Sequence, residues 1–243
     1  MVLEFLLPVL LAGVPYYVFF EETALLSKDK IFLFAAGFLT AGLLLAVLFE
    51  QRLSTAAAVI ALAGSVYTLY KASATTNLYK IAYYLLFLNA PMMIMFQISN
   101  SFFYGVCLLI SATGLFLVGK FYEKSYGSAN YRCVSGITLV TPYAGLVLTV
   151  YLTALALYPP FPNALLFLNV IMQADIGLLW YVAVVVIFFG NFLIAVRVMA
   201  KTVFGKPNPN VHYIDFGRKQ KAVHAMLFIL LAAFTAFSIG ELL

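Results

Sequence analysis

The chain has 243 residues, of which 65% are hydrophobic and only 9% are charged, and its mean hydropathy is +1.04. A soluble domain is nearer to half apolar and a quarter charged. This composition therefore excludes a soluble domain and predicts an all-α, polytopic membrane protein. The net charge of +5 does not indicate nucleic-acid binding, because in a membrane protein the basic residues report which loops face which side.

The length allows about eight membrane spans of roughly 20 residues each, and residues 1–243 are expected to form a single membrane domain. In chain order, the spans are predicted at Leu3–Phe20, Ile31–Phe49, Leu53–Tyr70, Ile81–Ile98, Phe102–Gly119, Gly136–Gln173, Ile176–Val196 and Ala222–Leu242. The first segment is interpreted as a span and not as a signal peptide, because Glu4 precedes its apolar run and no clear small-residue cleavage site follows. Short turns are expected at Glu50–Arg52 and at Ser99–Ser101.

The sixth predicted span is interrupted. It contains the run Tyr158-Pro159-Pro160-Phe161-Pro162, and three prolines in four positions cannot continue a helix, because they remove amide donors and clash with the preceding turn. Inside a bilayer, such a break is tolerated only where protein or a water-filled cavity satisfies the freed backbone groups. The sequence therefore predicts one discontinuous helix, broken near Pro159–Pro162, of the kind that often marks an ion or substrate pathway.

The basic residues are distributed very unevenly among the predicted loops. Of the 14 Lys and Arg residues, all but Arg52 fall in alternate loops, namely the first, third, fifth and seventh. The positive-inside rule places those loops on the matrix or cytoplasmic side and both termini on the other side. This assignment requires the interrupted stretch to cross the membrane once.

No Lys, Arg, Asp, Glu or His lies in the middle third of any predicted span. Proton and ion carriers need ionisable groups at that depth. The chain therefore lacks the mid-membrane ionisable residue that such a carrier would use. A file of polar residues around the break has two possible roles, hydrogen bonding between neighbouring helices or a residual hydrated path. Its members are Asn163, Asn169, Gln173, Asp175 and Asn191.

The long loop before the last span is basic, and it is a candidate site for anionic lipid headgroups such as cardiolipin. The residues concerned are Lys201, Lys206, Arg218, Lys219 and Lys221. Non-specific surface charge explains the same residues equally well. The two cysteines and the two histidines lack metal-ligand spacing, and His224 is expected at the membrane interface. No catalytic residue, metal site or cofactor is predicted.

Several segments resemble, in their order, the C-terminal half of the antiporter-like membrane-arm subunits of respiratory complex I. Leu157-Tyr158-Pro159-Pro160-Phe161 is similar to that family's "G-L-P-P-F" break, and Gly136 through Pro142 resembles the glycine-then-proline start of its broken helix. Phe204-Gly205 followed by Asp215 resembles its "F-G … D" loop. Further upstream, Phe49 to Leu53 with Ala56 to Gly64 resembles its "Q-x-x-L-K-R-x-L-A-Y-S-S-I" turn and helix. The resemblance covers roughly residues 30–243.

The resemblance implies a fold and a location. This chain also departs from the family's pattern at several positions. The family places a lysine or glutamate just after the break, where this chain has Phe167. Its lysine in the helix matching the first span, and its mid-membrane lysine or histidine, have no counterpart here. A complete member has about fourteen helices in two inverted repeats, so this chain is expected to be a split or truncated, degenerate member. Its partners would be other membrane subunits, including a chain that supplies the missing N-terminal half.

The resemblance thus implies a non-redox subunit of an NADH:quinone oxidoreductase-like assembly, without catalytic residues of its own, that is structural or supports proton translocation. The implied location is the mitochondrial inner membrane, with a bacterial or archaeal cytoplasmic membrane as the alternative. Two other readings stay open: an independent secondary transporter for a small neutral solute, and an unrelated membrane scaffold or lipid-binding accessory protein.

Overall fold

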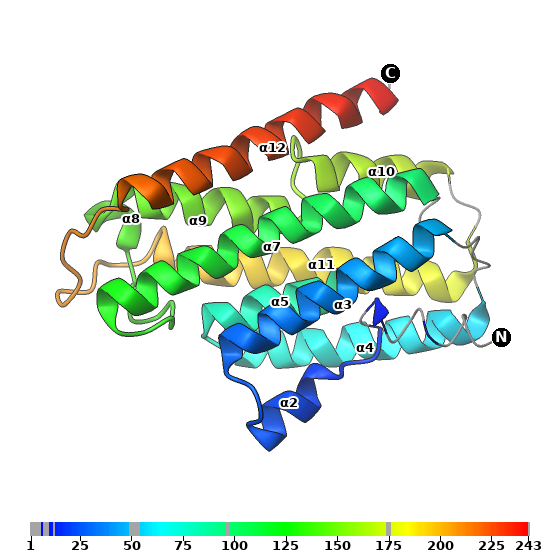
Figure 1. The fold of residues 1–243 in the computed structure, drawn as a ribbon, viewed down its shortest axis with the longest axis horizontal. Coiled ribbons are helices and arrows are strands. Elements are labelled where there is room, and N and C mark those ends of the chain that lie inside the picture. The colour runs from blue at the N-terminus through cyan, green and yellow to red at the C-terminus, as the bar shows by residue number, and fades with distance from the viewer. Residues whose placement is uncertain are drawn as a thin grey trace.

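The computed structural model describes residues 6, 10–11, 13–48, 54–95, 98–173 and 176–242. Within these ranges the chain is helical and contains no strand. The helices are α2 (Tyr17–Thr23), α3 (Lys28–Leu48), α4 (Thr55–Ala74), α5 (Leu78–Asn89), α6 (Met92–Met95), α7 (Ile98–Tyr126), α8 (Ile137–Val140), α9 (Pro142–Leu155), α10 (Pro162–Gln173), α11 (Leu178–Thr202) and α12 (Arg218–Leu242). The long helices lie along the long axis of the molecule (Figure 1).

Six segments among the described residues are long and apolar enough to cross a membrane, which makes the chain an integral membrane protein. They are Lys28–Ala46, Thr55–Ala74, Leu78–Met95, Ser101–Tyr126, Leu178–Thr202 and Arg218–Gly240. Of the two other expected spans, Leu3–Phe20 falls largely outside the described residues, and α2 begins only at Tyr17. Gly136–Gln173 is divided among α8, of 4 residues, α9, of 14 residues, and α10, of 12 residues.

The turn predicted at Ser99–Ser101 is wrong, because these residues lie inside α7. Before α7, the helix α5 ends at Asn89 and the short helix α6 follows. Pro91 lies two residues after Asn89 and has no amide hydrogen with which to continue the helix. The Ser101 hydroxyl instead donates to the Met93 carbonyl over 2.7 Å, which satisfies a backbone group that the interrupted helix leaves free.

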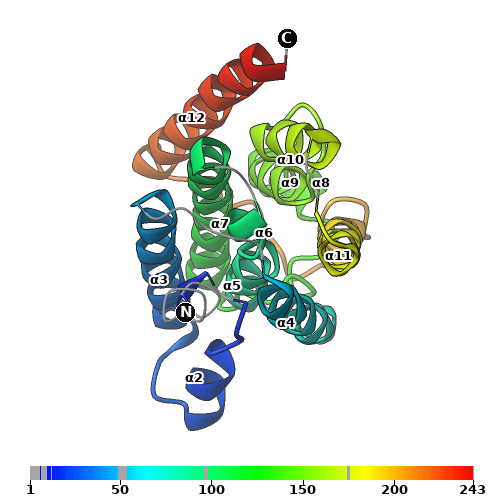
Figure 2. The ribbon, with the colours of Figure 1, turned by 90° about the vertical axis from the view of Figure 1, so that its right-hand side faces the viewer.

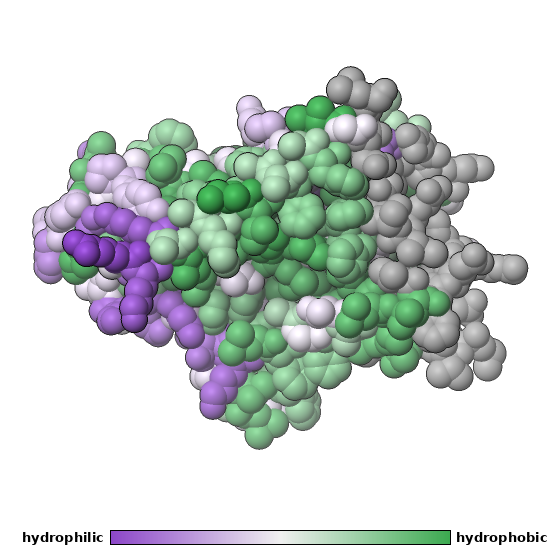
Figure 3. Space-filling model, turned by 45° about the horizontal axis from the view of Figure 1, so that its top comes forward, coloured by the Kyte–Doolittle hydropathy of each residue, from purple (hydrophilic) through white to green (hydrophobic). Residues whose placement is uncertain are grey.

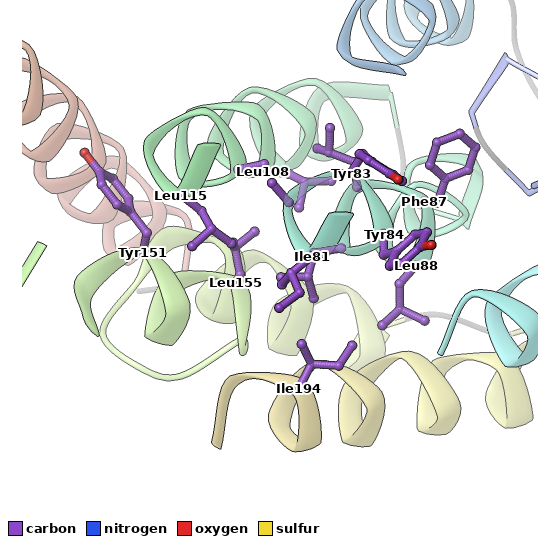
Figure 4. Packing of buried hydrophobic residues seen from close by; sticks show 14 of the residues in the cluster. Ile81, Tyr83, Tyr84, Phe87, Leu88, Leu108, Leu115, Tyr151, Leu155 and Ile194 are labelled. Atoms are coloured by element: carbon purple, nitrogen blue, oxygen red, sulfur yellow. The ribbon is translucent and has the colours of Figure 1, made fainter. Parts of the chain in front are cut away.

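The central element of the bundle is α5. Within the Leu78–Met95 segment, 94% of the residues are buried, and α5 packs against α3, α4, α7 and α11, as the end-on view shows (Figure 2). In Figure 4, apolar side chains of α5, α7, α9 and α11 meet in one cluster, with Ile81 of α5 among them. The helix begins where the Asn77 side chain accepts hydrogen bonds from the amides of Tyr79 and Lys80, at 3.0 and 3.3 Å.

The loops between the helices gather the basic residues at one end of the bundle, here called the loop end. The segment before α5 pairs with the loop after α7 through the bonds Leu78 N to Ala129 O, at 2.9 Å, and Tyr131 N to Thr76 O, at 3.0 Å. The turn before α8 joins the end of α11, because the Gly136 amide donates to the Lys201 carbonyl over 3.0 Å. Hydrophilic residues gather at this end and apolar residues cover the middle of the molecule (Figure 3).

Arg197, near the loop end of α11, holds the last turn of α4 in place. Its guanidinium donates to the carbonyls of Ala72, at 2.6 Å, and Thr75, at 2.9 Å, and also to the carbonyl of Ser73. These carbonyls lie at the helix C-terminus, where they lack intrahelical donors and where a cation is favoured by the helix dipole. The contact fixes α11 against α4 at this end of the bundle.

Candidate functional site

The break between α9 and α10 is built from a specific helix-ending motif. Leu157 has a left-handed backbone, with φ of 57°, although it is not glycine. The Tyr158 amide donates to the Thr153 carbonyl at 3.2 Å, and the Leu157 amide donates to the Ala154 carbonyl at 3.4 Å. This pair of bonds is the Schellman ending of a helix, which satisfies carbonyls that would otherwise be free.

The chain resumes its helix directly after the prolines. The Phe161 amide donates to the Tyr158 carbonyl at 3.1 Å, and the Phe161 carbonyl then accepts from Ala164 and Leu165. Pro162 is the first residue of α10, a position where its missing amide costs nothing and its fixed φ favours the helix. The two short helices follow one another from the loop end toward the opposite end of the bundle (Figure 1).

Asn163 lies just inside α10 and is 1% exposed. Neither its side-chain oxygen nor its side-chain nitrogen has a hydrogen-bond partner among the described residues. A buried amide without a protein partner is commonly satisfied by an internal water molecule, because leaving both atoms unpaired costs free energy. The break is therefore one of the places in the described bundle where buried polar atoms lack a protein partner and could bind water.

One turn further along α10 lies Phe167. It is buried, and its ring stacks on that of Phe188 of α11, with centroids 5.6 Å apart and planes 18° apart. This contact is apolar on both sides. Nothing in it can bind or release a proton.

A cluster of neutral polar side chains links the central helix to its neighbours. Asn89 of α5 and Asn191 of α11 exchange two hydrogen bonds, of 2.9 and 2.6 Å, and both residues are fully buried. The Tyr104 hydroxyl of α7 donates to Asn89 Oδ1 over 3.0 Å. The cluster ties three helices together through groups that carry no charge.

Asn163 and Asn191, two members of the predicted polar file, are not hydrogen-bonded to each other in the described structure. Asn191 pairs with Asn89, a residue that the sequence-based set does not include, and not with Asn163. Asn169 is buried on α10. The side chain of Gln173 and all of Asp175 lie outside the described part of the molecule.

A charged cluster occupies the loop end beside the start of α5. The carboxylate of Glu21 pairs with Lys80 over 2.9 Å, and its side chain is only 9% exposed. It also accepts hydrogen bonds from Tyr83 and, at 2.7 Å, from Tyr84. Burial raises the pKa of Glu21, but the hydrogen bonds from Tyr83, Lys80 and Tyr84 outweigh burial and hold the pKa below its ordinary value of 4.5.

His224, which the sequence predicts at the membrane interface, is buried between helices at the start of α12. It is 2% exposed, and its Nδ1 forms a hydrogen bond of 2.9 Å with the Tyr151 hydroxyl of α9. The ring of Phe216 contacts it edge-on, with centroids 5.0 Å apart. This packing joins α12 to α9, and it places the only buried histidine of the described chain close to the loop end.

The five basic residues proposed for lipid binding lie along the loop end, on the end of α11, the following loop and the start of α12. Lys221 forms an ion pair with Asp215. The hydrogen bond from Lys221 lowers the pKa of the Asp215 carboxyl. The loop itself is held against the 133–136 turn, because the Asn208 side chain donates to the Cys133 carbonyl at 2.8 Å.

Sequence reasoning missed Asn89, the Glu21–Lys80 pair and the Tyr151–His224 pair. The only available signal was that Glu21 and Lys80 fall in loops assigned to the same side. Among the described residues, no group of three or more His, Cys, Asp or Glu side chains could hold a metal ion. No protein-family model matches the chain, and no curated protein matches it either.

Proposed function

We propose that this chain is a non-redox membrane-arm subunit of an NADH:quinone oxidoreductase-like assembly, related to the antiporter-like subunits of complex I. It contributes structure and a residual hydrated path, without a proton-binding group of its own at mid-membrane. The proposed setting is the mitochondrial inner membrane, or a bacterial or archaeal cytoplasmic membrane, with the loop end on the matrix or cytoplasmic side. The proposed partners are other membrane subunits, including a chain that completes the missing half, and anionic lipids.

The observation that carries this proposal is the backbone of Leu157. In the family's "G-L-P-P-F" break, the residue before the Leu-Pro-Pro-Phe run is glycine, which adopts left-handed backbone at no steric cost. Leu157 stands at the matching position and has a φ of 57° despite its side chain. A left-handed leucine costs roughly 1–2 kcal/mol relative to a right-handed one. A left-handed backbone at the position that matches the family's glycine, in spite of this cost, supports the proposal.

The interior of the bundle supports the second half of the proposal. The residue after the break is Phe167, stacked on Phe188, and the cluster around Asn89 is neutral. Asn163 is the one polar side chain at the break with both amide atoms unsatisfied among the described residues. Water bound there would hydrate the break, but an amide does not titrate at physiological pH. The chain can thus line a wet passage without driving protons through it.

The orientation of the loops agrees with the same proposal. The segment Phe204-Gly205 through Asp215, which resembles the family's "F-G … D" loop, lies at the loop end. The loop end also carries nearly all of the basic residues. The rule that positive loops face the matrix or cytoplasm gives this segment the side that it has in the family.

The decisive experiment is native electrophoresis of membranes solubilised in a mild detergent, with the chain detected through a small epitope tag. The proposal expects the chain to co-migrate with a large complex that stains for NADH oxidation, and mass spectrometry to identify other membrane-arm subunits in that band. Migration near the size of a monomer, without NADH-oxidising activity, would refute it. That result would favour the independent transporter or the lipid-binding scaffold instead.

A further inference from the structure

A polar cavity lies at the loop end, apart from the helix break. It has a volume of about 520 Å³ and is partly open to the surroundings. Its walls come from the α2–α3 connection, the start of α5 and the end of α7. The charged lining residues are Glu21, Lys28, Asp29, Lys80 and Glu123. Volumes of this order are typical of sites for small organic groups.

Two of the wall contacts are already made inside the protein. Lys80 pairs with the largely buried Glu21, and the Tyr79 hydroxyl donates to Glu123 Oε2 over 2.7 Å. Lys28 and Asp29 form no ion pair among the described residues. Lys28 is therefore the uncommitted lysine, while Glu123, bonded to Tyr79 through Oε2, and Asp29, hydrogen-bonded to Ser27, each keep acceptor capacity for a ligand. The cavity thus offers both signs of charge with an acidic excess.

The position of the cavity points to a membrane lipid. Asp29 is in the first turn of α3, Lys80 is in the first turns of α5 and Glu123 is near the end of α7, so the cavity is level with the ends of three spanning helices, where lipid headgroups lie. Apolar side chains that are close in the chain to the lining residues are exposed, since Phe19, Leu25 and Leu33 are each more than half exposed. A ligand with a charged head and hydrocarbon tails suits both surfaces.

The charges restrict the class of headgroup. A bare metal ion is disfavoured, because the carboxylates are not grouped closely enough to coordinate one. An anionic headgroup would meet two carboxylates, Asp29 and Glu123, and only one uncommitted lysine. A primary ammonium can donate three hydrogen bonds to carboxylates, whereas a quaternary choline donates none and is usually held by a cage of aromatic rings. Among the described residues, Tyr79 is the only aromatic side chain that lines the cavity.

We propose that this cavity binds the headgroup of phosphatidylethanolamine, with the ammonium held by Asp29 and Glu123 and the phosphate held by Lys28. This inference does not depend on the respiratory assignment, because it requires only that the chain spans a membrane. It also differs from the anionic-lipid site expected on the basic loop, since the two sites would select headgroups of different charge.

The test is native mass spectrometry of the purified full-length chain in detergent, titrated with lipids of identical acyl chains. The lipids are phosphatidylethanolamine, its N-monomethyl and N,N-dimethyl derivatives, phosphatidylcholine and phosphatidylglycerol. The proposal expects binding to fall stepwise with each added methyl group, by about fivefold in total, because each step removes one hydrogen-bond donor to a carboxylate. Soluble phosphoethanolamine in a competition arm distinguishes recognition of the headgroup from adhesion of the tails.

The matched variants are Asp29→Asn and Glu123→Gln, which keep the side-chain shape, and Glu123→Gln also keeps an acceptor for Tyr79. Each should reduce the preference for ethanolamine over choline to about twofold or less, while Glu22→Gln, on the exposed face of α2, should leave it unchanged. Equal binding of the ethanolamine and choline lipids by the wild-type chain would overturn the proposal. An unchanged preference in a folded Asp29→Asn/Glu123→Gln double variant would overturn it as well.

Discussion

Asn89 and Asn191 face each other across the interface of α5 and α11, and each side-chain amide donates one hydrogen bond to the other, at 2.9 and 2.6 Å. The two residues are 102 positions apart in the sequence. Their environments differ, because Asn89 also donates to the Leu85 carbonyl and accepts from Tyr104. Asn89 therefore keeps partners if Asn191 is removed, whereas Asn191 depends on Asn89.

This asymmetry predicts that Asn89→Leu destabilises the protein more than Asn191→Leu. We expect about 1–3 kcal/mol for the first, which leaves a buried amide unpaired, and about 0.5–1.5 kcal/mol for the second. The double replacement should cost less than the sum, because it leaves no orphaned amide. Thermal unfolding in detergent measures all three. Ser65→Ala is the matched control, since the buried Ser65 hydroxyl has no partner among the described residues; additive costs would contradict the prediction.

The lowered pKa of Glu21 predicts that acid destabilises the loop end. Its folded pKa lies below the ordinary 4.5 because Tyr83, Lys80 and Tyr84 stabilise the carboxylate despite its burial. A carboxyl with a depressed folded pKa contributes stability that is fully present above the unfolded pKa and is lost as the pH falls through the folded value. The thermal midpoint should therefore decrease when the pH is lowered below about 4.5. Glu21→Gln should make this decrease smaller. Glu22→Gln should leave the profile unchanged, and an identical profile for Glu21→Gln would exclude this role.

Gly114 sets the distance between α7 and α9. A Cβ atom at this position would lie 2.2 Å from two ring carbons of Tyr151, whose hydroxyl is bonded to His224. We expect Gly114→Ala to lower stability by about 1–3 kcal/mol, because the added methyl group overpacks a tight interface. Gly37→Ala, where a Cβ meets nothing within 4 Å, should instead be neutral or stabilising by about 0.5–1 kcal/mol. Equal thermal midpoints for the two variants would contradict the prediction, because they would show that the interface between α7 and α9 has room for the added methyl group.

The prolines at the break should matter for assembly more than for turnover, if the proposed function holds. Alanines at Pro159 and Pro160 widen the backbone freedom of the loop and let α9 extend past its Schellman ending. We expect the amount of chain in the large complex to fall severalfold, while activity per assembled complex stays within about twofold. Pro209→Ala, in an exposed part of the loop before α12, is the control. Normal assembly together with lost proton translocation would contradict the prediction.

The sequence alone predicted much of the local structure. Leu53–Tyr70 and Ile176–Val196 were expected as spans, and the corresponding helices are Thr55–Ala74 and Leu178–Thr202. The prolines predicted a helix interruption near Pro159–Pro162, and in the structure α9 ends at Leu155 and α10 begins at Pro162. These features depend on apolar length and on backbone chemistry, both of which are local and can therefore be read along the chain.

The partners of the polar side chains were decided only by tertiary structure. Helices such as α3 and α7 are apolar on nearly every side, so their hydrophobic pattern does not reveal which face turns toward a neighbour. The pairing of Asn191 with Asn89, of Glu21 with Lys80 and of His224 with Tyr151 depends on that rotation. In this protein the sequence by itself predicts an all-helical membrane chain from its apolar length and backbone chemistry, and the packing of the helices determines which polar groups meet.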